Sequence, residues 1–306
     1  MVPTQAGEFL EVAAAGVRLR AQRWRAREPR GVVLLLHGGG QTRHSWGAAG
    51  PVLAQAGWDA VAYDTRGHGD SGWAEPHAYG IDHLVADLQA VVGATCDGPP
   101  VLVGASMGGL TSLIAEGERP GTARALVLVD IVPRIEPVGV ERITSFMHGA
   151  PHGFGSLEEV AEAVRAYNPL RERPVDVEGL RKNVRRREDG RWYWHWDPAM
   201  MAPRRLEDVA GHEDRLAAAA RAVRVPTLLL HGEQSDVVSD EGVAEMLALV
   251  PSARAARISG AGHMVAGDDN SVFARDVVPF LSELPDVGAR GLTPRPGAAG
   301  QPAAPG

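Results

Sequence analysis

The feature that most constrains this chain is an apolar strand that runs directly into a G-x-S-x-G turn. Val101–Ala105 has the pattern of a buried strand, Ser106 stands at the turn, and small side chains suited to a helix start follow Met107. Glycines two positions before and after the serine indicate that neighbouring backbone passes too close for a Cβ. Such a corner exposes the serine and points the Met107 N–H toward developing negative charge. We therefore predict that Ser106 is a nucleophile.

The composition excludes several classes of protein. The 306 residues carry a formal net charge of −7, which argues against nucleic acid or an anionic membrane as the main partner. No apolar run approaches the roughly 18 residues of a membrane helix, and no secretory signal pattern is visible. The single cysteine, Cys96, excludes an internal disulfide framework. We expect a soluble, cytoplasmic protein whose partner is a small-molecule substrate, and a homodimer is compatible with these features.

Short apolar strands alternate with helical stretches along most of the chain. This pattern is typical of an α/β protein with a mostly parallel sheet flanked by helices. The alternation stops near Pro133 and resumes near Arg224, and the segment between them has more Arg and Glu, helical periods and no convincing strand. We therefore predict a core formed by residues 1–132 and 225–285, with an inserted helical cap over residues 133–224.

The predicted cap contains three helical patterns. Ser156 opens the first with a capping box that reaches Glu159, and two further helices are expected over residues 176–187 and 204–223. The last segment of the chain, residues 286–306, holds mainly Gly, Pro and Ala. Because it has few apolar side chains to bury, it cannot offset the conformational entropy that ordering would cost, and we expect this tail to be disordered.

A glycine run follows the strand at residues 31–36 and suits an oxyanion hole. In His37-Gly-Gly-Gly40, the missing side chains let a backbone N–H approach a negatively charged oxygen. We predict that Gly39 or Gly40 provides the second donor beside the Met107 N–H.

Two further strand ends carry the residue types that a serine nucleophile needs. Asp236 follows one buried strand, and His263 stands between loop glycines after the next. Strand ends at one edge of a parallel sheet converge, and the order Ser, Asp, His is the one expected for this arrangement. We predict His263 as the base and Asp236 as the acid that orients it. Asp130, at the end of another strand, and Asp240, at a helix start, remain alternatives for the acid.

With these segments the chain resembles the α/β-hydrolase-fold enzymes. The segments that carry the resemblance are residues 37–40, 63–71, 104–108, 232–236 and 260–263. They are similar to the branch that contains cofactor-free perhydrolases and haloperoxidases, carbon–carbon bond hydrolases, epoxide hydrolases and small esterases. Dehalogenases and epoxide hydrolases of that branch place an aspartate at the elbow, so Ser106 argues against both activities.

Two other motifs do not support the chemistry that they suggest. Residues 67–72 match G-x-G-x-x-G, but Pro76 disfavours the helix that a dinucleotide site requires after its third glycine. His148 and His152 have helical metal-ligand spacing but lie among glycine and proline. We predict no nucleotide cofactor and no metal.

Tryptophans crowd one stretch of the predicted cap. Trp192, Trp194 and Trp196 fall on one face if the segment is extended, and Trp46 follows the oxyanion glycines. Clustered indoles suit the wall of a binding site, so we predict that these four line the substrate cavity. That the cap tryptophans instead attach the cap to the core remains an equal alternative.

These features together predict a cofactor-free serine hydrolase. It would cleave a carboxylic ester, thioester or lactone with an apolar part through an acyl-enzyme. The resemblance leaves open perhydrolysis and hydrolysis of a carbon–carbon bond in a β-diketone-like ring-fission product. The latter would need a basic residue for a second carboxylate, such as Arg187 or Arg191. A non-catalytic ligand receptor is the alternative from another class.

Overall fold

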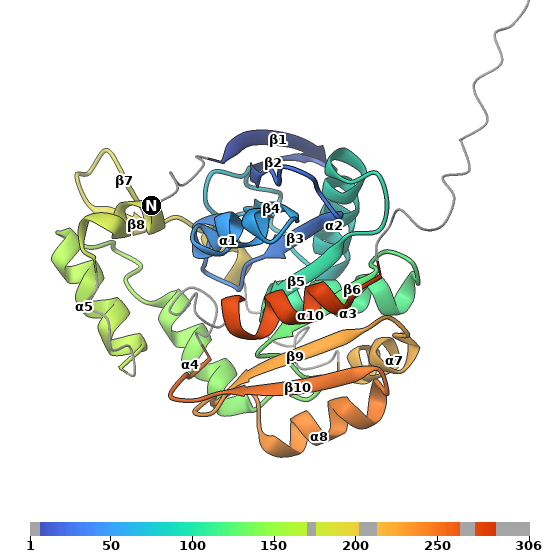
Figure 1. Cartoon of the computed structure of the whole chain (residues 1–306). Helices are drawn as coiled ribbons and strands as arrows, with labels where there is room; N and C mark the ends of the chain where they lie inside the picture. The colour runs from blue at the N-terminus through green and yellow to red at the C-terminus, as the bar shows by residue number, and fades with distance from the viewer. Residues whose placement is uncertain (1–6, 170–175, 202–212, 264–272, 286–306) are drawn as a thin grey trace, which may run out of the picture.

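One eight-stranded sheet runs through the computed structural model of the chain (Figure 1). Residues 7–169, 176–201, 213–263 and 273–285 are described. In pairing order the strands are β1 (Glu8–Ala14), β2 (Val17–Trp24), β4 (Asp59–Tyr63), β3 (Val32–Leu36), β5 (Val101–Ala105), β6 (Ala125–Val129), β9 (Thr227–Gly232) and β10 (Ala253–Ile258). The pairings of β1 with β2 and of β2 with β4 are antiparallel, and all others are parallel. The α/β class with a mostly parallel sheet is therefore confirmed.

The central strands are buried on both faces, which explains their continuous runs of Val, Leu and Ala. Because side chains alternate along a strand, Leu34 and Leu36 join one apolar cluster and Val33 and Leu35 join another. Helices that pack on the first face are α2 (Ile81–Thr95), α3 (Met107–Glu118), α7 (Glu213–Ala222) and α8 (Asp240–Leu249). The second face is covered by α1 (Ala49–Gln55) and by α10 (Val278–Glu283), which continues a π-helical turn, η4 (Phe273–Val277).

The predicted cap lies to one side of the sheet, at the left of Figure 1. Its elements are α4 (Pro137–His148), α5 (Leu157–Tyr167), the 3-10 turns η2 (Glu178–Asn183) and η3 (Pro198–Met201), and the strands β7 (Val184–Arg186) and β8 (Trp192–Trp194). These elements share a separate apolar cluster centred on Phe154, Val160 and Trp194. One half of the capping box is confirmed, since the Ser156 hydroxyl accepts the Glu159 N–H at 3.3 Å. The Glu159 carboxylate accepts the N–H of Gly155, at 2.7 Å, in place of that of Ser156.

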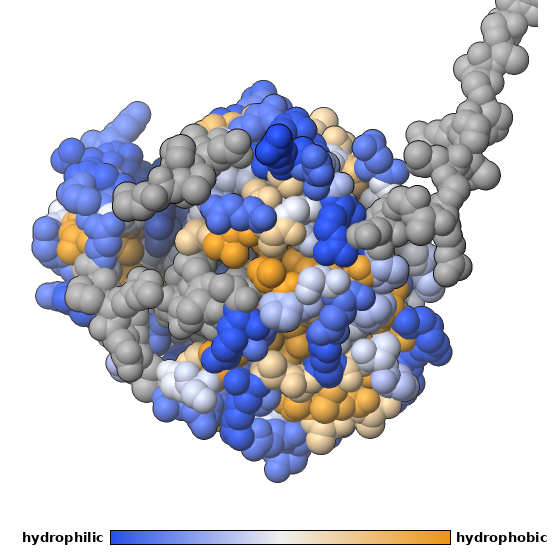
Figure 2. Space-filling view, viewed as in Figure 1, coloured by the Kyte–Doolittle hydropathy of each residue, from blue (hydrophilic) through white to orange (hydrophobic). Residues whose placement is uncertain are grey.

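The expectation of an all-helical cap is wrong. Residues 176–187, predicted as one helix, form the short turn η2 and then pair as β7 with β8 in an antiparallel hairpin. In β8, Trp192 and Tyr193 are half-buried, and Trp194 is buried in the apolar cluster of the cap. Its arginine-rich outer surface forms the strongly hydrophilic region at the upper left of Figure 2.

Helix α7 falls inside the predicted cap segment but packs with the core. Leu216, Ala219 and Ala220 belong to the apolar cluster that covers the sheet, and α7 lies against α3. The sequence boundary near residue 224 thus differs from the packing. The beginning of the helix predicted over residues 204–223, and the tail predicted at residues 286–306, lie outside the described residues. None of the described helices is long and apolar enough to cross a membrane.

Two helical glycines provide a matched test of the α3–α7 contact. A Cβ at Gly117 would lie 2.4 Å from the Ala219 carbonyl oxygen, whereas nothing lies within 4 Å of one at the exposed Gly93 in α2. We expect Gly117→Ala to lower the free energy of unfolding by about 1–3 kcal/mol through overpacking. Gly93→Ala should raise it by about 0.5–1 kcal/mol through helix propensity. Urea unfolding of both variants checks this. Equal changes in the free energy of unfolding would contradict the close contact between α3 and α7.

Candidate active site

Ser106 occupies the tight turn between β5 and α3. Its backbone has φ 47° and ψ −116°, which is unusual for a residue other than glycine, and its N–H donates to the Val129 carbonyl at 2.9 Å. A Cβ at Gly104 would lie 2.4 Å from the Gly108 oxygen, and one at Gly108 would lie 2.4 Å from the Leu36 oxygen. The structure therefore needs glycine at both positions, as predicted from the sequence.

His263 links the serine to a buried carboxylate. Its Nε2 lies 3.1 Å from the Ser106 Oγ, and its Nδ1 lies 2.7 Å from the Asp130 Oδ2. The side chains of His263 and Asp130 are only 5% and 1% exposed. With Nδ1–H donating to the carboxylate, Nε2 is the nitrogen left to accept the serine proton.

The Asp130 carboxylate is held by donors from the end of β9 and from the loop that follows it. Its Oδ1 accepts the Gly232 N–H at 2.9 Å, and its Oδ2 also accepts the Ser235 hydroxyl at 2.6 Å. Ser235 in turn accepts the N–H groups of Val237 and Val238 at 3.2 and 3.1 Å. A buried carboxylate with this many donors is stabilised as an anion facing the imidazole.

The prediction of Asp236 as the orienting acid is corrected by this geometry. The Asp236 carboxylate instead forms an ion pair with Arg142 of α4, with N–O distances of 2.7 and 2.8 Å. Ser235 bonds back to Asp130, and the following residue consequently meets the cap rather than His263. Asp240 lies in the first turn of α8 and pairs with Arg257 at 3.4 Å. Of the three candidates, Asp130 is the one that contacts His263.

The glycine loop after β3 offers one free donor near the serine, not two. The Gly38 N–H donates to the Gln41 side chain at 2.9 Å, and the Gly40 N–H donates to His68 Nε2 at 3.1 Å. Neither Gly39 N–H nor Met107 N–H has an acceptor among the described residues. Gly39 and Met107 can therefore serve an oxyanion, whereas Gly40 does not fit the role predicted for it.

An apolar cavity of about 220 Å³ adjoins Ser106, His263 and Gly39. Leu110, Ile131 and Val237 of the core line it together with Val140 and Ile143 of α4. Gln41, Thr144 and Tyr167 supply polar atoms, and burial raises the pKa of Tyr167 to about 12. The described side chains around this cavity include no arginine, lysine or carboxylate.

None of the four predicted tryptophans is among the described residues that line the cavity. Trp46 is fully buried beneath the sheet with the second apolar cluster. Trp194 stacks on Trp196 inside the cap, with ring centroids 4.8 Å apart. Trp192 lies under the guanidinium groups of two arginines, Arg181 and Arg186. Large apolar area serves packing as well as binding, and here the cap tryptophans pack the cap.

Three buried histidines lie in and around the glycine loop: His37 begins it, and His68 and His195 pack against it. The Thr65 N–H donates to His37 Nε2 at 3.0 Å, and the Gly40 and Gly69 N–H groups donate to His68 and to His195 Nδ1 at 3.1 and 2.8 Å. Because each ring accepts an N–H, each is neutral. Burial lowers the pKa of His37 to about 4 and that of His68 to about 3, and holds the pKa of His195 well below 6.5. Nothing in the sequence indicated this cluster beyond the histidines themselves.

The buried histidines predict acid sensitivity of the fold. Below pH 6.5 the unfolded chain binds protons at His37 and His68 that the folded chain excludes down to about pH 4. Stability therefore rises with pH across this window and is lost as pH falls. Each of these two imidazoles should make the free energy of unfolding about 2 kcal/mol lower at pH 5 than at pH 7. Urea unfolding at both pH values checks this. His68→Gln should make the dependence shallower, and an unchanged slope would contradict the assignment.

Comparison with known proteins places the chain among hydrolases. Residues 27–270 match the family model described as serine aminopeptidase, S33. The chain is 33% identical over 261 residues to esterase Rv0045c of Mycobacterium tuberculosis, covering 82% of each protein. It is 27% identical to a 3-hydroxybutyrate-oligomer hydrolase of Cupriavidus necator, over 76% of this chain and 82% of that protein. The structure of an E-2-(acetamidomethylene)succinate hydrolase superposes with a TM-score of 0.77 at 21% identity, covering 90% of this chain and 99% of that one.

Proposed function

Because this chain belongs to the serine aminopeptidase, S33, family and is an α/β-hydrolase-fold enzyme, we propose that it hydrolyses carboxylic esters with a neutral, apolar acyl group through Ser106, His263 and Asp130. The observation that carries this proposal is the hydrogen-bonded chain from Ser106 through His263 to Asp130, at the edge of an apolar cavity.

In the first half of the proposed reaction, the Ser106 Oγ attacks the ester carbonyl carbon as His263 Nε2 takes its proton. The carbonyl oxygen becomes an oxyanion and accepts the N–H groups of Gly39 and Met107. Asp130 stabilises the imidazolium and holds its tautomer. The tetrahedral intermediate collapses when His263 returns the proton to the leaving alcohol, and the acyl group stays on Ser106.

In the second half, water replaces the alcohol. His263 takes a proton from water as its oxygen attacks the acyl carbon, and the same two N–H groups bind the second oxyanion. Return of the proton to Ser106 releases the carboxylic acid. Apart from this water molecule, the proposed steps use only these residues.

The lining of the cavity argues for an uncharged acyl group. Burying a carboxylate or ammonium without a partner is costly, and the described lining holds no fixed charge to pair with one. Arg187 and Arg191, named above as candidates for a second carboxylate, lie elsewhere: Arg187 covers the Tyr193 ring, and Arg191 donates to the carbonyls of His152 and Gly153. This placement favours ester hydrolysis over carbon–carbon cleavage of an acidic ring-fission product.

The roles of the three residues are tested by comparing two aspartates. Ser106→Ala should lower kcat for p-nitrophenyl butyrate by about 10³ or more. Asp130→Asn should lower it by about 10⁴, because the amide favours the wrong imidazole tautomer. Asp236→Asn should leave kcat within about threefold and lower the melting temperature slightly, since it weakens a half-exposed ion pair. A large loss of kcat in Asp236→Asn, with Asp130→Asn active, would reverse the assignment.

Acyl selectivity is tested with two esters of similar size. We expect kcat/KM for p-nitrophenyl butyrate to exceed that for p-nitrophenyl hemisuccinate by about 100-fold, a difference of about 3 kcal/mol for burying an unpaired carboxylate. Thr144→Arg adds a cation to the cavity wall and should lower the ratio of kcat/KM for the butyrate ester to that for the hemisuccinate ester. Equal turnover of both esters by the wild-type protein would show that the acyl group does not enter this cavity.

A further inference from the structure

Two imidazoles hold the backbone of Gly40 from opposite sides. The Gly40 N–H donates to His68 Nε2 at 3.1 Å, and the Gly40 carbonyl lies 3.2 Å from His195 Nε2. Since His195 Nδ1 accepts the Gly69 N–H at 2.8 Å, the proton of that ring is on Nε2, which donates to the carbonyl. Gly40 has a φ of +71°, so this contact fixes a backbone conformation that glycine alone adopts readily.

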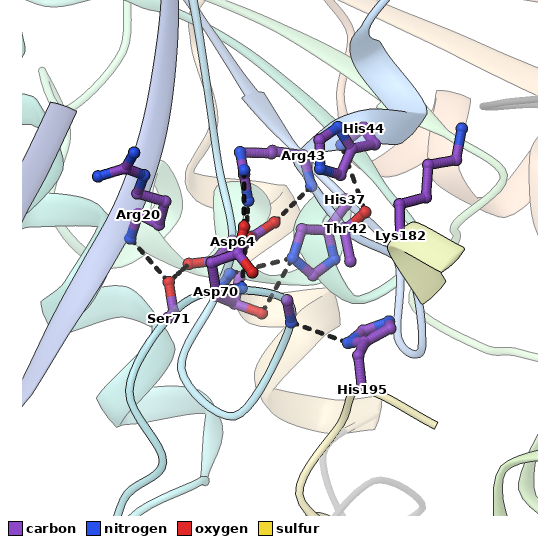
Figure 3. Close-up of polar contacts among 12 residues, drawn as sticks. Arg20, His37, Thr42, Arg43, His44, Asp64, Asp70, Ser71, Lys182 and His195 are labelled. Atoms are coloured by element: carbon purple, nitrogen blue, oxygen red, sulfur yellow. Dashed lines mark hydrogen bonds and ion pairs between the residues drawn. The ribbon is translucent and has the colours of Figure 1, made fainter. Parts of the chain in front are cut away.

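His195 belongs to the cap, whereas Gly40 belongs to the core. The cap segment around His195 is docked on the loop at residues 67–70. The Asp197 N–H donates to the Gly67 carbonyl at 2.9 Å, and Arg185 binds the Asp70 carboxylate at 2.7 Å. Figure 3 shows His195 reaching this loop beside the Asp64–Arg43 contact. The ring therefore bridges two parts of the molecule that are 155 residues apart at the His195–Gly40 contact.

The rest of the glycine loop is anchored in the core alone. Its first residue, His37, accepts the Thr65 N–H, and the chain after it is held where the Arg43 N–H donates to Asp64 at 2.6 Å. Between these anchors lie Gly39 and Gly40, and Gly39 lines the cavity with an N–H that has no acceptor among the described residues. The direction of that N–H depends on the peptide units on either side of it. The Gly39–Gly40 peptide is held by His68 through the Gly40 N–H, and the peptide after it is held by His195 through the Gly40 carbonyl.

We propose that His195 is a positioning residue that aims the Gly39 N–H at the oxyanion, so that the oxyanion hole is complete only when the cap is docked on the core. This inference rests on the proposed ester hydrolysis. Both ring nitrogens of His195 are engaged by backbone groups, and the ring is 2% exposed. His195 thus acts through Gly40 and is not a proton carrier.

Two isosteric substitutions separate the two hydrogen bonds of the ring. Gln places its amide near the position of Nε2 and can keep the donor to Gly40, whereas Asn reaches only the position of Nδ1 and can keep the acceptor for Gly69. We expect His195→Asn to lower kcat for p-nitrophenyl butyrate by about tenfold to 100-fold with an unchanged KM, the scale of a misaligned oxyanion donor. His195→Gln should stay within about threefold of wild type, because the donor is kept.

A transition-state analogue gives a second readout. An alkyl trifluoromethyl ketone forms a hemiketal oxyanion on Ser106, so its inhibition constant should rise in His195→Asn by the same factor as kcat falls. The control is Phe154→Leu, which loosens the apolar cluster of the cap. It should lower the melting temperature and leave kcat and the inhibition constant unchanged.

The inference is overturned if His195→Asn and His195→Gln lose kcat equally, or if kcat falls only in proportion to the melting temperature, as for a cap-packing residue. A normal kcat in His195→Asn, with Ser106→Ala inactive, overturns the inference and leaves the proposed function standing. Failure of the wild-type protein to hydrolyse p-nitrophenyl butyrate, or an active Ser106→Ala variant, overturns the proposed function itself.

Discussion

The buried carboxylate of Asp130 is the contact on which the arrangement of the site depends. A buried charge is tolerated only where donors surround it, and here they come from the end of β9, from the loop after β9 and from His263. The hydrogen bonds to this one carboxylate bring together the end of β6, the end of β9 and the loop that carries His263. The position of His263 relative to Ser106 follows from it, as does the course of the chain through Ser235 toward the cap.

Local features of the sequence predicted the sheet and most of the reacting groups. The buried strands, the glycines around Ser106 and the loop position of His263 follow from short-range sterics and periodicity, which one stretch of chain contains in full. Short-range features did not identify the aspartate that contacts His263. Asp130 and Asp236 both stand near strand ends, and what separates them is a hydrogen bond between Ser235 and a residue 105 positions earlier. A closer use of strand geometry favours Asp130, since β6 is paired directly with β5.

The errors over Gly40 and the tryptophans have a similar origin. Gly40 looked equivalent to Gly39 because both lack side chains, and the difference arises from the distant ring of His68. The indoles of Trp194 and Trp196 could pack a wall or a core, because their large apolar faces suit both. The β7–β8 hairpin sets where these indoles lie. The arginine-rich sequence between residues 181 and 191 has a helical pattern and did not indicate this hairpin.

The cavity wall is shared between core residues such as Leu110 and cap residues such as Ile143. A cap exchanged between relatives would therefore bring a new acyl-binding surface to an unchanged nucleophile, which makes the insert a natural unit for redesign. The same exchange replaces whatever stands at position 195. Grafts that begin and end within α4 would alter the wall alone, whereas grafts that extend through the hairpin would also have to supply a donor above the glycine loop.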